Sequence, residues 1–83
     1  MTTVADVPRV RSELGVIFTD VFEYDEPLQA STSPDDVPRW DSLSHIALVR
    51  VLEDTFEITL SMDEMLEIRS VADIEAVLGR HGV

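Results

Sequence analysis

Apolar residues recur with helical spacing in four stretches of the chain. The first stretch runs from about residue 7 to residue 22, with Asp6 as the expected N-cap and Pro8 in the first turn. At 100° per residue its apolar side chains share one arc: Val7, Val10, Leu14, Ile17, Phe18, Val21 and Phe22. This pattern predicts an amphipathic helix that buries a single face.

The second stretch begins at Asp41 or Ser42, runs to about Phe56, and carries apolar residues on two faces. One face has the spacing of a core stripe: His45, Leu48, Val49, Leu52 and Phe56. The other face holds Leu43, Ile46 and Ala47, beside Arg50 and Asp54. Periodicity alone fits two structures equally well, a central helix buried all round and a helix with an exposed docking face.

The rest of the chain predicts two further helices and no strand. Residues 58–60 are read as a connector, and a short helix is expected from about Ser61 to Leu66. The last helix has Ser70 as N-cap and Asp73 at its third position, with Gly79 and Gly82 marking its end. We therefore expect one all-α domain over residues 1–83, a bundle of three longer helices and one short helix.

A long loop separates the first two helices. Residues 23–41 contain three prolines and six acidic residues against one arginine. A loop of this length is uncommon in a small bundle and is more often functional. Its position directly before Ser42 draws attention to the start of the second helix.

Composition excludes several classes of function. The chain has no cysteine, so disulfides, thiolate metal sites and a cysteine nucleophile are ruled out. A net charge of −11 disfavours nucleic acid and anionic membranes and favours partners with basic surfaces, although solubility alone also explains acidity. No apolar run approaches the ~20 residues of a membrane span, and the first residues lack signal-peptide features. We expect a cytoplasmic monomer.

Residues 37–46, with Trp40-Asp41-Ser42-Leu43 at their centre, resemble the Asp-Ser-Leu signature of acyl and peptidyl carrier proteins. The resemblance continues through Leu52–Phe56 and Ser70–Ile74, and it is most specific over residues 37–78. It implies that Ser42 is esterified with 4′-phosphopantetheine from coenzyme A, flanked by Asp41 and Leu43. The implied partner for this step is a phosphopantetheinyl transferase, and cargo is then held as a thioester on the arm.

The position of Ser42 suits this chemistry. With Asp41 as N-cap, Ser42 is the first helical residue, and an anionic phosphodiester there lies at the positive end of the helix dipole. The structural alternative is that Ser42 only caps the helix. A hydrolase using Ser42 and His45 is disfavoured, because there is no nucleophile elbow and no third group. We expect no catalytic residue. We also expect no metal site, because the acidic pairs Asp35-Asp36 and Asp63-Glu64 lack the spacing of a cation-binding loop.

Departures from the family pattern suggest a specialised carrier. Fatty-acid carriers place acids two and five residues after the serine, where this chain has Ser44 and Ala47. The Trp-Asp-Ser-Leu-x-His pattern of residues 40–45 and the run Glu-Met-Leu-Glu-Ile-Arg-Ser-Val of residues 64–71 resemble discrete carriers of secondary-metabolite pathways, including those serving polyketide extender-unit synthesis. Expected partners are an acyltransferase or adenylating enzyme that loads the arm, followed by synthase or tailoring enzymes. The expected docking residues are Leu43, Ile46, Ala47, Arg50, Glu53 and Asp54. An aminoacyl or peptidyl carrier, and an unmodified interaction module, remain as alternatives.

Overall fold

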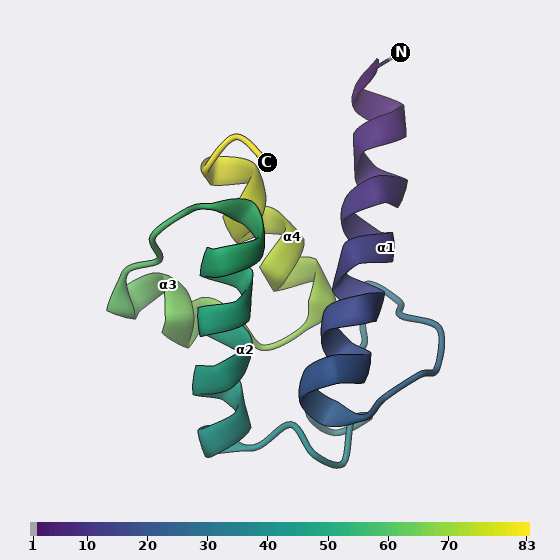
Figure 1. The fold of residues 1–83 in the computed structure, drawn as a ribbon, viewed down its shortest axis with the longest axis vertical. Helices are drawn as coiled ribbons and strands as arrows, with labels where there is room; N and C mark the ends of the chain where they lie inside the picture. The colour runs from purple at the N-terminus through teal and green to yellow at the C-terminus, as the bar shows by residue number, and fades with distance from the viewer. Residues whose placement is uncertain (1) are drawn as a thin grey trace.

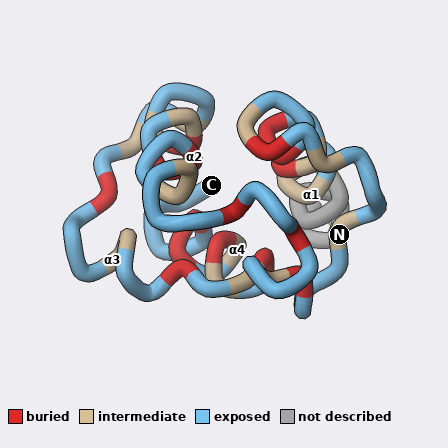
Figure 2. Tube along the Cα trace, turned by 90° about the horizontal axis from the view of Figure 1, so that it is seen from below, coloured by how far each residue is buried: buried red, intermediate tan, exposed pale blue. Residues whose placement is uncertain are grey.

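Four helices make up the computed structural model, which describes the backbone of residues 2–83 and the side chains of residues 10–83. They are α1 (Thr2–Phe22), α2 (Ser42–Phe56), α3 (Met62–Glu67) and α4 (Val71–Arg80). Helices α1 and α2 run antiparallel, with α4 across one side of this pair and α3 beyond α2 (Figures 1 and 2). The predicted all-α architecture is confirmed, and residues 2–83 contain no strand.

Two helix ends differ from the prediction. Helix α1 begins at Thr2 rather than near residue 7, so Asp6 lies within it and is not its N-cap. Pro8 likewise lies inside α1 and not in its first turn; its ring fixes φ in the helical range, so the helix continues through it with the loss of one backbone hydrogen bond. The side chains of Asp6, Val7 and Pro8 lie outside the described residues. Helix α4 continues through Gly79 to Arg80, and of the two glycines expected at its end Gly82, at φ 82°, has the left-handed backbone that favours glycine while Gly79 is helical.

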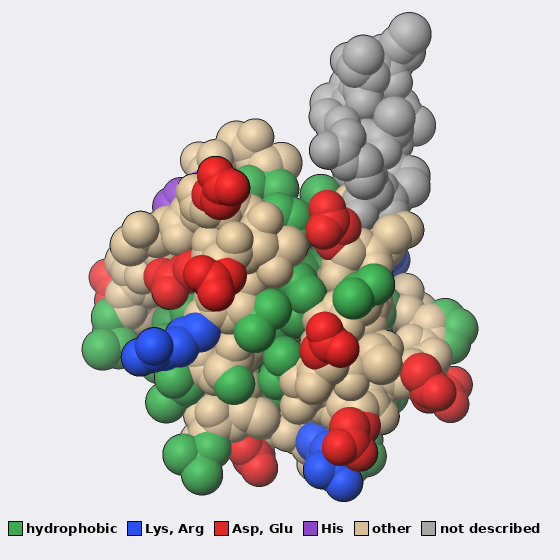
Figure 3. All heavy atoms as spheres, viewed as in Figure 1, with side chains coloured by type: hydrophobic (Ala, Val, Ile, Leu, Met, Phe, Trp, Pro, Cys, Tyr) green, Lys and Arg blue, Asp and Glu red, His purple; other side chains and the backbone are tan. Residues whose placement is uncertain are grey.

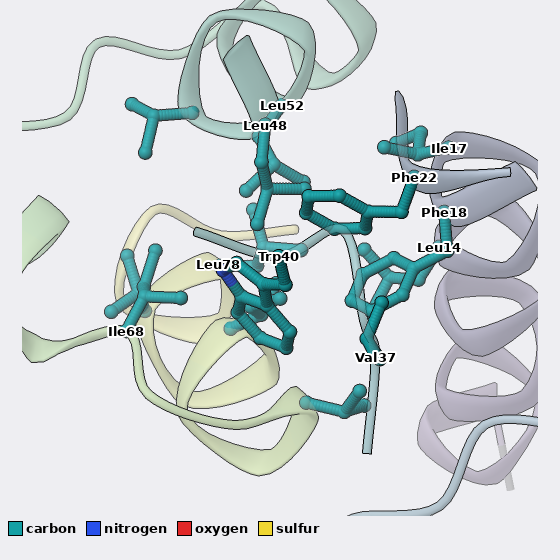
Figure 4. Packing of buried hydrophobic residues seen from close by; sticks show 14 of the residues in the cluster. Leu14, Ile17, Phe18, Phe22, Val37, Trp40, Leu48, Leu52, Ile68 and Leu78 are labelled. Atoms are coloured by element: carbon teal, nitrogen blue, oxygen red, sulfur yellow. The ribbon is translucent and has the colours of Figure 1, made fainter. Parts of the chain in front are cut away.

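The core forms where α1, α2, α4 and the long loop meet. Helix α1 contributes Phe18 and Phe22, whose rings are 5.1 Å apart in an edge-to-face arrangement. Trp40 from the loop stacks on Phe22 at 5.4 Å (Figure 4). The predicted apolar faces of the first two helices supply Leu14, Ile17, Leu48, Val49 and Leu52, and α4 adds Val71, Ile74, Val77 and Leu78. Aromatic pairs of this kind stabilise a core beyond the area that they bury.

The long loop is ordered by its own hydrogen bonds. The first amides of α4 donate to loop carbonyls, Val71 to Thr32 and Ala72 to Ala30, both at 2.9 Å. Thr32 is itself buried, and its hydroxyl accepts the amide of Gln29. These bonds satisfy helix amides that would otherwise lack a partner. The loop is therefore part of the packed structure and fixes the position of Trp40, immediately ahead of the predicted site.

None of the helices within residues 2–83 combines the length and apolarity that crossing a membrane requires.

Candidate functional site

The start of α2 is held by a reciprocal cap. Asp41 has extended backbone angles (φ −122°, ψ −170°), and its carboxylate accepts the amide of Ser44 at 3.0 Å. The Ser44 hydroxyl accepts the Asp41 amide at 2.8 Å. Hydrogen bonds from Ser44 lower the pKa of Asp41 below its ordinary value, so the carboxylate stays charged at neutral pH. The predicted N-cap is thus confirmed.

Ser42 follows the cap as the first residue of α2, and it is exposed. Asp41 and Ser44 cap the helix, so Ser42 does not act as the capping residue and the structural alternative is disfavoured. The described residues make no hydrogen bond with the Ser42 hydroxyl. Esterification there would break no internal bond. The phosphate group would lie at the amino end of a 15-residue helix, where the dipole favours an anion. The residues present therefore fit a covalently attached phosphodiester.

A groove of about 460 Å³ opens beside Ser42, between α2 and α3. Its walls come from the loop, the first turns of α2 and the end of α3. The lining residues are Pro34, Trp40, Asp41, Ser42, His45, Ile46, Met65, Leu66 and Ile68. Apolar groups form most of the wall, so the groove suits an apolar ligand with polar groups only at its Ser42 end.

Sequence reasoning missed the α3 side of this groove. Met65, Leu66 and Ile68 form its far wall, yet α3 is only six residues long. A segment this short has too few positions for a hydrophobic period to emerge. The spacing of Met62, Met65 and Leu66 was the one available signal that α3 presents an apolar face.

His45 and Trp40 meet at the floor of the groove. The Trp40 indole Nε1 donates to His45 Nδ1 at 2.9 Å, and His45 Nε2 lies 2.9 Å from the Met65 carbonyl oxygen. His45 belongs to the predicted core stripe of α2, and it is partly buried and lines the groove. Both ring nitrogens are engaged, so His45 is not free to act as a base toward Ser42. This geometry argues against a hydrolase.

The second apolar face of α2 is exposed. Leu43 is 81% accessible and Ile46 47%, while Ala47, Arg50 and Asp54 are also at the surface. This excludes the alternative of a central helix buried on all sides. On this side of the molecule, over α2 and α3, hydrophobic side chains lie beside and below a basic one, and acidic side chains lie above it (Figure 3). The neighbouring helix α3 adds two exposed apolar residues that the sequence did not point to, Met62 and Leu66.

Glu53 differs from the other expected docking residues. It is half-buried, and its carboxylate accepts the amide of Leu60 at 2.8 Å. This bond holds the connector between α2 and α3. Its position gives Glu53 a structural role, and a partner could reach its carboxylate only in competition with that bond.

Metal coordination finds no support in the part of the chain described with side chains. Within residues 10–83, no group of three or more His, Asp or Glu side chains could hold a metal ion. The acidic pairs of the sequence instead make local bonds. Glu64, for example, accepts the amide of Ser61 at the start of α3.

Comparison with known proteins agrees with this site. A protein-family model described as a phosphopantetheine attachment site matches residues 40–78, which include Ser42. A holo acyl carrier protein from Geobacter metallireducens is 31% identical, with a TM-score of 0.75 over 83% of this chain and 80% of that one. A candidate acyl carrier protein from Mycobacterium tuberculosis has the same fold, with a TM-score of 0.76 at 23% identity over 84% of this chain and 95% of that one. No curated protein sequence matches this chain. The chain belongs to the acyl carrier protein family, whose cofactor is covalently attached 4′-phosphopantetheine.

Proposed function

We propose that Ser42 is the attachment residue for 4′-phosphopantetheine and that the chain carries acyl groups between enzymes without catalysing a reaction itself. The observation that carries this proposal is the exposed, unbonded Ser42 hydroxyl at the start of α2, beside an apolar groove. When bound, the arm supplies a thiol that holds cargo as a thioester. Tethering raises the effective concentration of the cargo at each enzyme.

The residues around Ser42 favour attachment in separate ways. Asp41 and Ser44 fix the backbone of the first turn of α2, so the Ser42 side chain leaves the helix from a fixed position at the surface. The helix dipole stabilises the phosphate charge, which offsets repulsion from the neighbouring Asp41 carboxylate. The groove beside Ser42 can shelter an apolar part of the arm or its cargo from water. Leu43 is 81% exposed next to Ser42 and is available to the transferase.

We infer a docking surface that spans α2 and α3. It consists of Leu43, Ile46, Ala47, Arg50 and Asp54 from α2, with Met62 and Leu66 from α3. Exposed apolar groups rimmed by charge are typical of an interaction surface. The transferase, a loading enzyme and the downstream enzymes would each bind here in turn, to a monomeric carrier in the cytoplasm.

The pathway proposed is polyketide or related specialised synthesis. This finer assignment rests on the departures from the fatty-acid pattern, namely Ser44 and Ala47 where acids are usual and Arg50 on the docking surface. The hydroxyl and the amide of Ser44 both form hydrogen bonds with Asp41, so Ser44 does not contact a partner in place of the acid that is usual at this position. An aminoacyl or peptidyl carrier loaded by an adenylating enzyme is the alternative cargo class.

The decisive experiment is intact-mass measurement after incubation with coenzyme A and a broadly acting phosphopantetheinyl transferase. The expected result is a mass gain of one phosphopantetheine that is abolished in Ser42→Ala. Ser12→Ala, which removes an exposed serine on α1, should still be modified. An unchanged mass in the wild-type chain would contradict the carrier proposal and favour an unmodified interaction module. Offering the modified chain to acyltransferase and adenylating partners then identifies the cargo class.

A further inference from the structure

Three segments of the chain meet at one imidazole ring. His45 lies on the first turns of α2, Trp40 ends the long loop, and Met65 lies near the end of α3. The planes of the Trp40 indole and the His45 ring are nearly parallel, with an interplanar angle of 12° and centroids 6.2 Å apart. The two hydrogen bonds of the ring, each 2.9 Å long, join the loop to α2 and α2 to α3.

The chemistry of the two partners determines the protonation of the ring. An indole N–H can only donate, so Nδ1 of His45 must carry a lone pair. A backbone carbonyl can only accept, so Nε2 must carry the proton. Only the neutral Nε2–H tautomer satisfies both bonds. In the charged imidazolium, the Nδ1 proton would point at the indole proton and the bond to Trp40 would be lost.

Helix α3 is held in place by hydrogen bonds to other parts of the chain. With six residues, none fully buried, it is far below the length at which an isolated helix is stable. At its start, Glu64 contacts His81 beyond α4 at 3.0 Å. At its end, the Met65 carbonyl accepts both the Ile68 amide at 3.3 Å and the bond from His45. Among the hydrogen bonds of the described side chains, the bond from His45 links the end of α3 to α2, while Glu67 pairs with Arg80 of α4.

We propose that neutral His45 is a positioning residue that holds the end of α3 and the loop ahead of Ser42 at fixed distances from α2. Since Trp40, His45 and Met65 all line the groove beside Ser42, the two bonds fix the relative positions of three of its lining residues. The proposal relies on the proposed function only for the use of the groove. Its tests use the unmodified chain, so a failure of Ser42 modification would leave their outcome unchanged.

The first test is the nitrogen NMR spectrum of the wild-type chain at neutral pH. The chain has two histidines and one tryptophan, so the signals of His45 and the Trp40 indole are readily assigned. The expected result is a proton on Nε2, a bare Nδ1 and a coupling between Nδ1 and the indole N–H. A proton on Nδ1, or a charged ring at neutral pH, would overturn the proposal without any variant.

Two substitutions separate the two bonds. Asparagine places its amide oxygen as many bonds from the backbone as Nδ1, whereas glutamine places its amide nitrogen as far as Nε2. His45→Asn should therefore retain the indole signal of Trp40, while the Ile68 amide exchanges with solvent about five- to tenfold faster, as expected for losing one hydrogen bond. His45→Gln should show the reverse, with a shifted indole signal and near-normal exchange at Ile68.

The matched control is His81→Gln, which removes an imidazole from the other end of α3. This variant should leave the Trp40 indole signal unchanged, because His81 contacts Glu64 and not the groove. If the Asn and Gln variants alter both signals equally, or alter neither, His45 does not position the two walls separately and the proposal is wrong.

Discussion

Asp41 and Ser44 exchange hydrogen bonds across the first turn of α2, and Ser42 lies between them with its hydroxyl unused. The two residues carry the whole capping role. Because Ser42 takes no part in the cap, its hydroxyl is available for modification. It also means that the capping residues and the attachment residue can be changed independently.

We expect the folded chain to lose stability in acid because of the carboxylates of Asp41 and Glu64. The Ser44 and Ser61 amides, respectively, donate to these groups and hold their pKa values below the ordinary ones. A lowered folded-state pKa contributes stability that is present above the unfolded-state value and is lost as the pH falls through the folded-state value. We expect the urea midpoint to decrease below about pH 4, where carboxyl groups titrate.

Asp41→Asn is the control for this prediction. Asparagine caps a helix nearly as well as aspartate but does not titrate. The variant should therefore remain folded at pH 7 and lose less stability than the wild-type chain between neutral pH and acid. An unchanged acid dependence would show that Asp41 contributes nothing to it.

The two faces of α2 should respond differently to truncation. Leu48 is fully buried, and Leu48→Ala should lower the free energy of unfolding by about 2–5 kcal/mol. Ile46 is 47% exposed, and Ile46→Ala should cost well under half as much. Chemical denaturation of the two variants side by side measures the difference.

Ile46→Glu tests whether the exposed face of α2 contacts partner enzymes. The variant should fold, while the transferase, the loading enzyme and the downstream enzymes all act on it more slowly. Circular dichroism and the rate of thioester formation provide the two measurements. If Ile46→Glu unfolds the chain, this face belongs to the core and the docking surface is wrongly assigned.

Arg50→Glu is a charge-only probe of the docking surface. Arg50 is exposed and, among the described side chains, pairs with no acid, so the fold should tolerate the change. Surface charge acts mainly on encounter, so the association rate with partner enzymes should change and the change should shrink with salt. Arg69→Glu, an exposed arginine outside the proposed surface, is the matched control. Equal effects of the two substitutions would indicate a response to net charge alone.

The ion pair between Arg11 and Glu75 should contribute modestly to stability. It joins α1 to α4, with Arg11 Nη2 3.0 Å from Glu75 Oε1, and Arg11 also donates to the Leu28 carbonyl. Because both side chains are partly exposed, we expect Glu75→Gln to cost about 0.5–1 kcal/mol, and less in high salt. Thermal denaturation at two ionic strengths measures both effects. A salt-independent loss would point to packing instead of charge.

Much of the fold follows from local pattern. The cap at Asp41, the cap at Ser70 with the Asp73 amide, and the core stripe of α2 are all short-range features, and sequence periods report them directly. The exposure of Ile46 did not follow, because periodicity identifies an apolar face without showing what covers it. The groove wall at Met65 depends on how α3 packs, which a six-residue segment does not encode alone. The bond from Trp40 to His45 needs both the register of the loop and a particular tautomer.

Two carbonyls of the long loop accept the first amides of α4. This contact determines where the loop can tolerate an insertion. The carbonyls of Ala30 and Thr32 complement the N-cap Ser70 by accepting the first two amides of a helix that lies about 40 residues later in the sequence. An insertion at the exposed residues 25–27 would lengthen the surface path only. The same insertion at residues 30–32 would leave α4 without partners for Val71 and Ala72. Tolerated length variation between the first two helices is thus confined to one end of the loop, away from Trp40 and the serine that follows it.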